Sequence, residues 1–135
     1  MINQNYLHSA LTSDILKAYY KVYNALGYGF LEKVYENAMM IELRKMGIQA
    51  TQQQRIKVYY EGEKVGEYFA DLLVENKVIV ELKAKKTFHP EDEAQLYNYL
   101  NATTVEVGML LNFGEEPEHK RRVLTNDKKS FLNQK

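Results

Sequence analysis

Residues 68–83 constrain the fold more than any other part of the chain, because they combine the pattern of core strands with charged side chains. Two apolar runs, both rich in β-branched residues, flank a short polar break at residues 75–77. This pattern is typical of a β-hairpin. Three ionisable residues interrupt the apolar runs, namely Asp71, Glu81 and Lys83. The sequence therefore predicts a hairpin that carries charges where core residues would be expected.

The faces on which these charges lie follow from the alternation of side chains along a strand. Glu81 and Lys83 share one face. Asp71 joins that face if Val74 pairs with Val78 across a three-residue loop. A two-residue turn would shift the register by one residue and send Asp71 to the opposite face. We predict the three-residue loop.

Charged groups on a buried strand face cost several kcal/mol each unless another group pairs with them or ligates them. Two carboxylates and an ammonium that converge there are the groups that a hydrolytic site with a divalent metal requires. The carboxylate oxygens hold Mg²⁺ or Mn²⁺, and the lysine orients or activates a water. The alternative is an exposed edge strand, where Glu-x-Lys is common and Asp71 would discourage edge pairing. The hairpin alone leaves both interpretations open.

Three further motifs accompany the Asp and Glu-x-Lys pattern. Residues 29–35 (GFLEKVY) fit Gly-x-x-Glu-x-x-Tyr, and residues 95–99 (QLYNY) fit Gln-x-x-x-Tyr. Residues 107–114 (VGMLLNFG) read as an apolar strand and a turn. In this order the four motifs resemble the GxxExxY family of the PD-(D/E)XK nuclease superfamily, and QLYNY is similar to the helix motif of its RecB-type members. The resemblance covers about residues 10–125, and Ala70 stands where a proline often precedes the Asp.

The resemblance implies a role for each charged residue of the hairpin. Asp71 and Glu81 are expected to ligate Mg²⁺ or Mn²⁺, with the Leu82 carbonyl as a further ligand. Lys83 is expected to position or deprotonate the attacking water.

Residues outside the hairpin complete the predicted site. Glu32 lies within a broad apolar arc of its helix, so it is expected to face inward. There it would either ligate the metal or accept a hydrogen bond from a group that ligates the metal. The alternative is a glutamate favoured by the helix dipole. Gln95 and Tyr99 are four residues apart and share a helix face. We expect them to orient the nucleophile or a phosphate, although Gln95 also fits an ordinary surface amide.

Apolar periodicity and turn residues predict two helices followed by a mixed sheet. The helices cover about residues 9–25, with Thr12 or Ser13 as the N-cap, and 30–46, ended by Gly47. The later elements are expected at about residues 54–61, 65–75, 78–84, 91–100, 106–113 and, optionally, 122–125. The order α-α-β-β-β-α-β suits a three-stranded meander followed by a helical crossover to one more strand. The fold class is α/β (an α+β mixed sheet), and the resemblance implies a restriction-endonuclease-like core.

Length and composition restrict the class of protein. The 135 residues are expected to form a single domain, residues 1–135, with a core at about residues 10–125. Cysteine is absent, which excludes disulfides and thiolate zinc sites and agrees with a reducing cytoplasm. No apolar run reaches membrane-spanning length and no signal peptide is recognisable, so we expect a cytoplasmic protein with no membrane partner.

Charge is balanced overall but uneven near the C-terminus. The net charge is zero, which argues against tight non-specific binding to nucleic acid. Residues 120–135 nevertheless contain Lys120, Arg121, Arg122, Lys128, Lys129 and Lys135. We expect a basic tail that either holds phosphates or is simply solvated.

The predicted function is that of a metal-dependent phosphodiesterase, a nuclease that acts on nucleic acid, with DNA as the expected substrate and Mg²⁺ or Mn²⁺ as the cofactor. A catalytically silent nuclease-like module that binds nucleic acid or protein is the alternative, and zero net charge favours it. Metal-dependent hydrolysis of another phosphoester is a third interpretation. The charged residues of the hairpin favour the enzyme, because a pure scaffold has no reason to retain buried charges. A homodimer is compatible with each interpretation.

Overall fold

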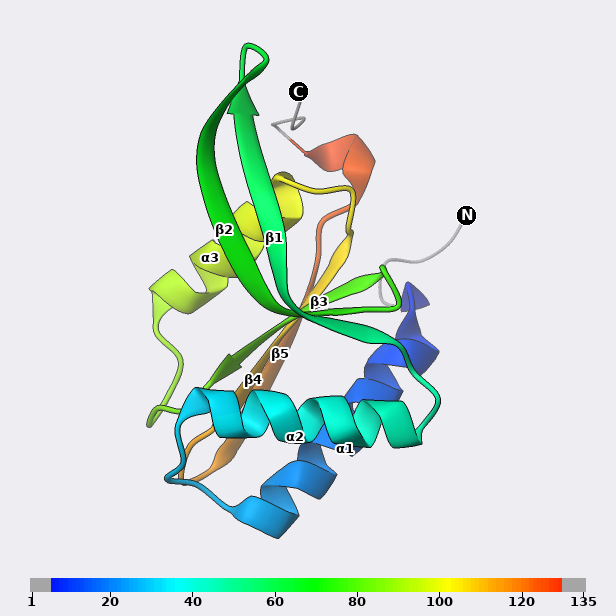
Figure 1. Ribbon diagram of the computed structural model, residues 1–135, viewed down its shortest axis with the longest axis vertical. Helices are drawn as coiled ribbons and strands as arrows, with labels where there is room; N and C mark the ends of the chain where they lie inside the picture. The colour runs from blue at the N-terminus through cyan, green and yellow to red at the C-terminus, as the bar shows by residue number, and fades with distance from the viewer. Residues whose placement is uncertain (1–5, 130–135) are drawn as a thin grey trace.

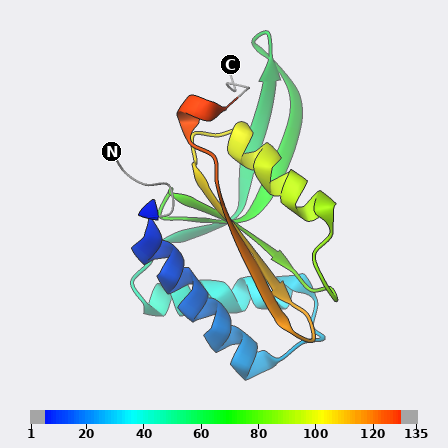
Figure 2. The ribbon, with the colours of Figure 1, turned by 180° about the vertical axis from the view of Figure 1, so that it is seen from behind.

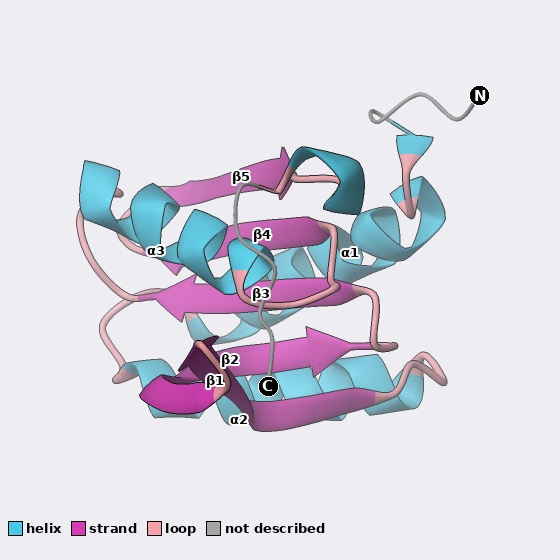
Figure 3. Cartoon of the chain, turned by 90° about the horizontal axis from the view of Figure 1, so that it is seen from above, coloured by secondary structure: helices cyan, strands magenta, loops and turns pink. Residues whose placement is uncertain are grey.

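A five-stranded mixed sheet with helices on both faces forms the part of the chain that the computed structural model describes, residues 6–129 (Figure 1). The elements in chain order are α1 (Ser9–Leu26), α2 (Glu32–Lys45), β1 (Ala50–Tyr60), β2 (Glu63–Val74), β3 (Val78–Lys83), α3 (Pro90–Asn101), β4 (Val107–Phe113), β5 (Pro117–Val123) and the 3₁₀ helix η2 (Asn126–Lys128). The strands lie side by side in the order β1-β2-β3-β4-β5 (Figure 3). Strands β3 and β4 are parallel and joined through α3, whereas the other neighbours are antiparallel. The predicted mixed fold class, with its meander and helical crossover, is confirmed.

Two apolar cores lie on the two faces of the sheet, beneath the helices that Figure 2 shows on either side of it. Helices α1 and α2 cover one face, and the core beneath them includes Ile15, Tyr19, Tyr35, Met39, Leu43, Leu72, Val74, Val80 and Met109. Helix α3 covers the other face, and the second core includes Ile56, Ala70, Ile79, Leu96, Tyr99, Leu100 and Leu110. Strands β3 and β4 are buried on both faces, which explains their nearly continuous apolar sequences.

Glycine ends the second helix as predicted. Gly47 follows α2 with φ of 76°, a left-handed conformation that glycine adopts without a Cβ penalty. The next amide, of Ile48, donates to the Leu43 carbonyl at 2.9 Å, which is the longer hydrogen bond of a Schellman motif. One residue, Gly47, therefore determines where α2 ends.

The predicted N-cap of α1 is wrong. The helix begins at Ser9, so both Thr12 and Ser13 lie inside it. Thr12 is buried, and its hydroxyl donates to the Ser9 carbonyl at 3.2 Å. Inside a helix, a threonine hydroxyl can donate to a carbonyl of the preceding turn, and at a helix start it can act as the N-cap. The presence of a threonine therefore did not locate the start of α1.

The hairpin between β2 and β3 has the predicted register. Val74 pairs with Val78, and Leu72 pairs with Val80. Residues 75–77 form the loop, in which the Lys77 amide donates to the Val74 carbonyl at 2.9 Å. The three-residue loop is confirmed, and with it the register that places residue 71 opposite residue 81.

Both strands of the β1–β2 hairpin turn over part-way along their length. Leu72 belongs to the core under α1 and α2, whereas Ala70, two residues earlier on β2, belongs to the core under α3. Residues two apart on a regular strand share a face, so β2 must change its inward face at Asp71. On β1 the change coincides with Gln53, whose φ of 52° interrupts the regular pairing. Beyond this bend the two strands extend as an arm that lies alongside α3 (Figure 1).

The last strand is longer than predicted and changes the interpretation of the basic segment. Strand β5 begins at Pro117, where a loop was expected, and pairs with β4 at the edge of the sheet. Lys120, Arg121 and Arg122 lie within this strand, so they are not part of a solvated tail. Arg122 pairs with Glu93 of α3 at 2.7 Å. The end of the predicted tail, residues 130–135, lies outside the described residues.

None of the helices within residues 6–129 is both long enough and apolar enough to cross a lipid bilayer.

Candidate active site

The predicted carboxylates meet where β2 and β3 separate. Regular pairing of the two strands ends at Leu72 and Val80. At the next position the Asp71 amide donates to Oε2 of Glu81 at 2.6 Å, and the Leu82 amide donates to Oδ2 of Asp71 at 2.8 Å. Each carboxylate thus accepts a backbone N–H from the opposite strand in place of the missing ladder bond. The bend in β2 opens the fork, and the two side chains fill it.

Burial and neighbouring negative charges keep this pair of carboxyls from ionising fully. Glu81 is only 3% exposed. Burial, and then the nearby charge of Asp71, raise the pKa of Glu81 to about 8. The pKa of Asp71 is also raised, first by burial and then by Glu36, although its hydrogen bond from the Leu82 amide opposes the shift. At neutral pH the pair therefore retains a proton, mainly on Glu81.

Lys83 and Gln95 are brought together as the sequence predicted. Nζ of Lys83 donates to Oε1 of Gln95 at 3.3 Å and lies 3.8 Å from Oδ1 of Asp92. The neighbouring Lys85 makes the closer pair with Asp92, at 2.9 Å. Asp92 also accepts the His89 amide at 2.8 Å and so caps α3. Lys85 is thus held by the helix cap, whereas Lys83 retains only a long contact with that carboxylate.

Tyr99 closes the α3 side of the site. Its side chain is 3% exposed. Burial, followed by the charges of Glu81 and Asp71, raises the pKa of Tyr99 to about 12, so its hydroxyl stays protonated at any physiological pH. The ring of Tyr68, from β2, packs against it with 5.5 Å between the ring centroids. Gln95 and Tyr99 share the helix face that points to the hairpin, as their spacing predicted.

Glu32 occupies a more exposed position than predicted. It is the first residue of α2, and the structure leaves it exposed, so the inward orientation expected from the helical arc is wrong. Its charge still contributes to the raised pKa of Glu81, as the smallest of the named causes. A glutamate in the first turn of a helix is favoured by the helix dipole, which was the alternative interpretation.

The buried glutamate of α2 is Glu36, one turn further on and 3% exposed. Its carboxylate accepts hydrogen bonds from Lys33 at 2.8 Å and from the amides of Gln52 and Gln53 at 2.7 Å. Gln53 also reaches Oδ1 of Asp71 at 3.4 Å. Glu36 therefore supports Asp71 through Gln53, a link that sequence reasoning missed. The available signal was the run of three glutamines at residues 52–54, which is unusual at the start of a strand.

The Gly-x-x-Glu-x-x-Tyr motif has a structural explanation. Tyr35 is fully buried and stacks on Phe113 with 4.1 Å between ring centroids. Its hydroxyl donates to the Gly27 carbonyl at 2.7 Å and accepts the Phe30 amide at 3.2 Å. Gly29, at φ of 112°, lets the chain turn between these two contacts. The motif thus fixes the loop that leads into α2 and so positions the start of that helix.

The set of donor atoms is small, and it suits a divalent cation that prefers oxygen ligands. Within residues 6–129 no three His, Cys, Asp or Glu side chains are grouped so that they could hold a metal ion. Asp71 and Glu81 are adjacent, and each uses one oxygen on a backbone amide. Two hard carboxylates with water completing the shell are how proteins commonly hold Mg²⁺. The residues present therefore fit Mg²⁺ or Mn²⁺, and the predicted role of the Leu82 carbonyl as a ligand stays a prediction.

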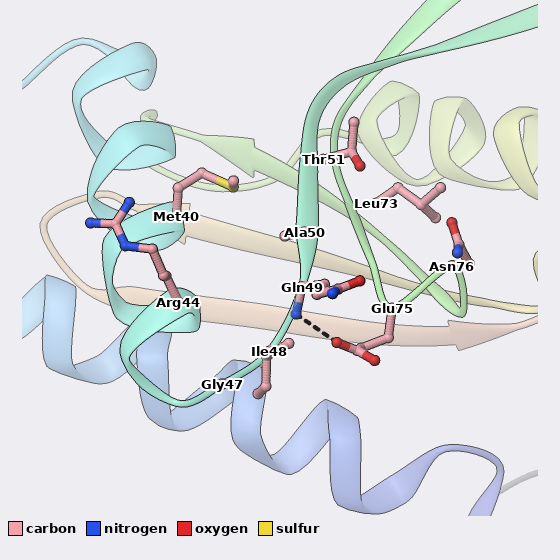
Figure 4. A pocket seen from close by; sticks show the side chains of 10 residues that line it. All are labelled: Met40, Arg44, Gly47, Ile48, Gln49, Ala50, Thr51, Leu73, Glu75 and Asn76. Carbon is pink, nitrogen blue, oxygen red and sulfur yellow. Dashed lines mark hydrogen bonds between the residues drawn. The ribbon is translucent and has the colours of Figure 1, made fainter.

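A cavity of about 500 Å³ lies elsewhere, between the end of α2 and the β2–β3 turn (Figure 4). Arg44 and Met40 line it from α2, and Glu75 and Asn76 line it from the turn. Glu75 accepts the Gln49 amide at 2.5 Å, which ties the turn to the start of β1. No predicted site residue lines this cavity, so it is separate from the carboxylate pair.

Comparisons with known proteins agree with this fold. A family model described as PD-(D/E)XK nuclease superfamily matches residues 9–123. A solved structure, "Crystal structure of SSO0001", has a similar fold, with a TM-score of 0.57 at 14% sequence identity. The match covers 90% of this chain and 62% of that chain, so this chain spans less than two thirds of the length of that protein. Curated protein sequences gave no significant match.

Proposed function

The chain belongs to the PD-(D/E)XK nuclease superfamily, and from this premise we propose that it is a metal-dependent nuclease that hydrolyses phosphodiester bonds in DNA. The observation that supports this most directly is the carboxylate pair in the fork between β2 and β3. A structural role does not explain two buried carboxyls that fill one fork between strands, where the charge of Asp71 raises the pKa of Glu81. Strained titratable pairs of this kind are typical of functional sites.

Asp71 and Glu81 would hold the cation, and Mg²⁺ or Mn²⁺ would stabilise the negative charge that develops on the phosphate. Lys83 lies on the same strand face as Glu81 and would hold a water or take its proton. Gln95, which already contacts Lys83, would keep the lysine in place and orient the water. Tyr99 stays neutral at the edge of the site, and its hydroxyl would donate a hydrogen bond to a phosphate oxygen.

We further infer that the chain is a GxxExxY member of the superfamily. This rests on Gly29 and Tyr35, whose contacts explain two of the three motif positions. Glu32, the third, would act at longer range, as a charge at the start of α2 that draws the cation toward the pair.

DNA cleavage tests the proposal. Purified protein is incubated with circular and linear DNA in Mg²⁺, in Mn²⁺ and in EDTA, and Asp71→Asn serves as the variant that removes one carboxylate charge. We expect cleavage that requires the metal and is lost in Asp71→Asn. Metal-dependent DNA binding without cleavage by the wild type would instead favour the catalytically silent module.

The affinity for metal should depend on pH, because Glu81 must lose its proton to bind a cation. The pKa of about 8 sets the window. Between pH 6 and pH 8 we expect the association constant for Mn²⁺ to rise by about tenfold per pH unit, with the release of about one proton, and to level off above pH 8. Isothermal titration in two buffers of different ionisation enthalpy measures both quantities. A constant affinity across this range would show that Glu81 is not a ligand.

A further inference from the structure

A second cavity, of about 320 Å³, lies between the β1–β2 arm and the end of α3. Val58 and Tyr68 line it from the β1–β2 arm, and Asn98, Asn101 and Ala102 line it from the end of α3. Its volume lies at the lower end of the range of small-molecule sites.

The chemistry of this lining selects a particular kind of ligand. Among residues 6–129, those that line the cavity carry no charge, so they do not attract a phosphate or a metal ion. It offers an aromatic ring, from Tyr68, and two carboxamides, from Asn98 and Asn101. Aromatic rings stack on flat heterocycles, and asparagine amides pair with their donors and acceptors. The lining therefore suits a flat, neutral ring with polar edges.

Two of these groups, the Tyr68 ring and the Asn101 amide oxygen, are available to bind a ligand. The Tyr68 side chain is 46% exposed even though its ring packs against Tyr99. Oδ1 of Asn101 is buried and makes no hydrogen bond within residues 6–129. A buried amide oxygen without a partner costs stability, which is expected where a ligand supplies the partner.

The cavity also lies at a suitable distance from the carboxylates. Tyr68 precedes Asp71 by three residues on β2, which corresponds to about 10 Å along a strand. Tyr99 lies between the two sites, since it contacts Tyr68 and its pKa responds to both Glu81 and Asp71. A nucleotide whose phosphate is held at the carboxylates would bring a neighbouring base to Tyr68.

We infer that this cavity binds an unpaired nucleobase next to the scissile phosphate, with Tyr68 as the stacking platform and Asn98 and Asn101 reading the base edge. This rests on the proposed function, because the phosphate of the same strand would lie at the carboxylate pair. A base within a duplex cannot enter such a cavity, so the substrate at this point is single-stranded, frayed or flipped.

Equilibrium binding tests the inference without requiring catalysis. The probe is a fluorescein-labelled hexanucleotide of single-stranded DNA, compared with an abasic strand of the same length and charge, both in Ca²⁺. We expect the wild type to bind the intact strand about tenfold more tightly than the abasic one. Tyr68→Ala should abolish this difference, whereas Tyr60→Ala, which removes an exposed tyrosine at the far end of the same arm, should preserve it.

The amides are tested through base preference. The affinities of wild type for the four homopolymeric hexanucleotides are compared with those of the double variant Asn98→Ala/Asn101→Ala, which should bind all four with more similar affinity. Equal binding of intact and abasic strands by the wild type, or no binding of either, would overturn the inference. If the base-dependent difference is present but DNA is never cleaved, the base subsite stands and the nuclease proposal falls.

Discussion

Replacing Lys83 by alanine is expected to slow DNA cleavage by about 100- to 10,000-fold, the range over which a positioned acid or base contributes to catalysis. Lys83 shares a strand face with Glu81, and within residues 6–129 its ammonium makes one hydrogen bond, to the amide oxygen of Gln95 at 3.3 Å. Its longer contact with Asp92 is dispensable, because that carboxylate keeps Lys85 at 2.9 Å. Single-turnover cleavage with saturating Mn²⁺ measures the effect on the chemical step.

The matched control for Lys83→Ala is Lys86→Ala. Both substitutions remove one lysine from the same segment and change the net charge equally, but Lys86 is exposed beyond the end of β3. The control should retain nearly the wild-type rate. If both variants slow cleavage to a similar extent, the lysines act only as a basic surface that attracts DNA, and Lys83 has no special role.

Replacing Glu81 by glutamine is expected to stabilise the metal-free protein, and to do so more strongly as the pH rises. The pKa of Glu81 is about 8 in the folded protein and 4.5 in its reference state, so between these values the folded state binds more protons than the unfolded state. The contribution of Glu81 to the stability of the wild type is therefore greatest below about pH 4.5 and falls as the pH rises toward 8, by at most about 1.4 kcal/mol per pH unit. Glutamine mimics the protonated acid and removes this loss.

Thermal melts in EDTA from pH 5 to pH 9 measure this difference. Each kcal/mol shifts the melting temperature of a domain of this size by roughly 4 °C. We expect the melting temperatures of Glu81→Gln and the wild type to be closest near pH 5, to separate progressively up to about pH 8 and to differ by a constant amount above it. Glu63→Gln, on the exposed start of β2, should follow the wild type throughout. Saturating Mg²⁺ should narrow the gap, because the cation stabilises only the wild type. A variant that is less stable than the wild type at every pH would identify Glu81 as a structural partner of Lys83.

Most of the fold was predictable because it follows from short periods in the sequence. The register of the β2–β3 hairpin was predictable from its charges, because Asp71 and Glu81 share a face only if Val74 pairs with Val78. Gly47 fixed the end of α2 for an equally local reason. Strand β5 was underestimated because its sequence, PEHKRRV, is polar, as an edge strand tolerates.

The candidate site was predictable only where its residues stand out from the sequence around them. Asp71, Glu81 and Lys83 stand out as charges within apolar strands, and the structure brings Gln95 next to Lys83 as expected. Glu36 could not be assigned, because its partners Gln52 and Gln53 belong to a part of β1 that was predicted to begin only at residue 54. The residues next to Glu36 in the sequence do not indicate its hydrogen bond with Gln53, which lies 17 positions away.

The bend at Gln53 and Asp71 has a consequence for how proteins of this shape can diversify. All carboxylate contacts in the fork are made at or after the bend on β2, whereas the arm beyond it contributes Ile56 and Ala70 to the core under α3. Matched insertions or deletions near the turn at residues 61 and 62 would change how far the arm reaches without moving either carboxylate. The length of the arm can therefore vary from one related protein to another while the position of the carboxylate pair stays the same.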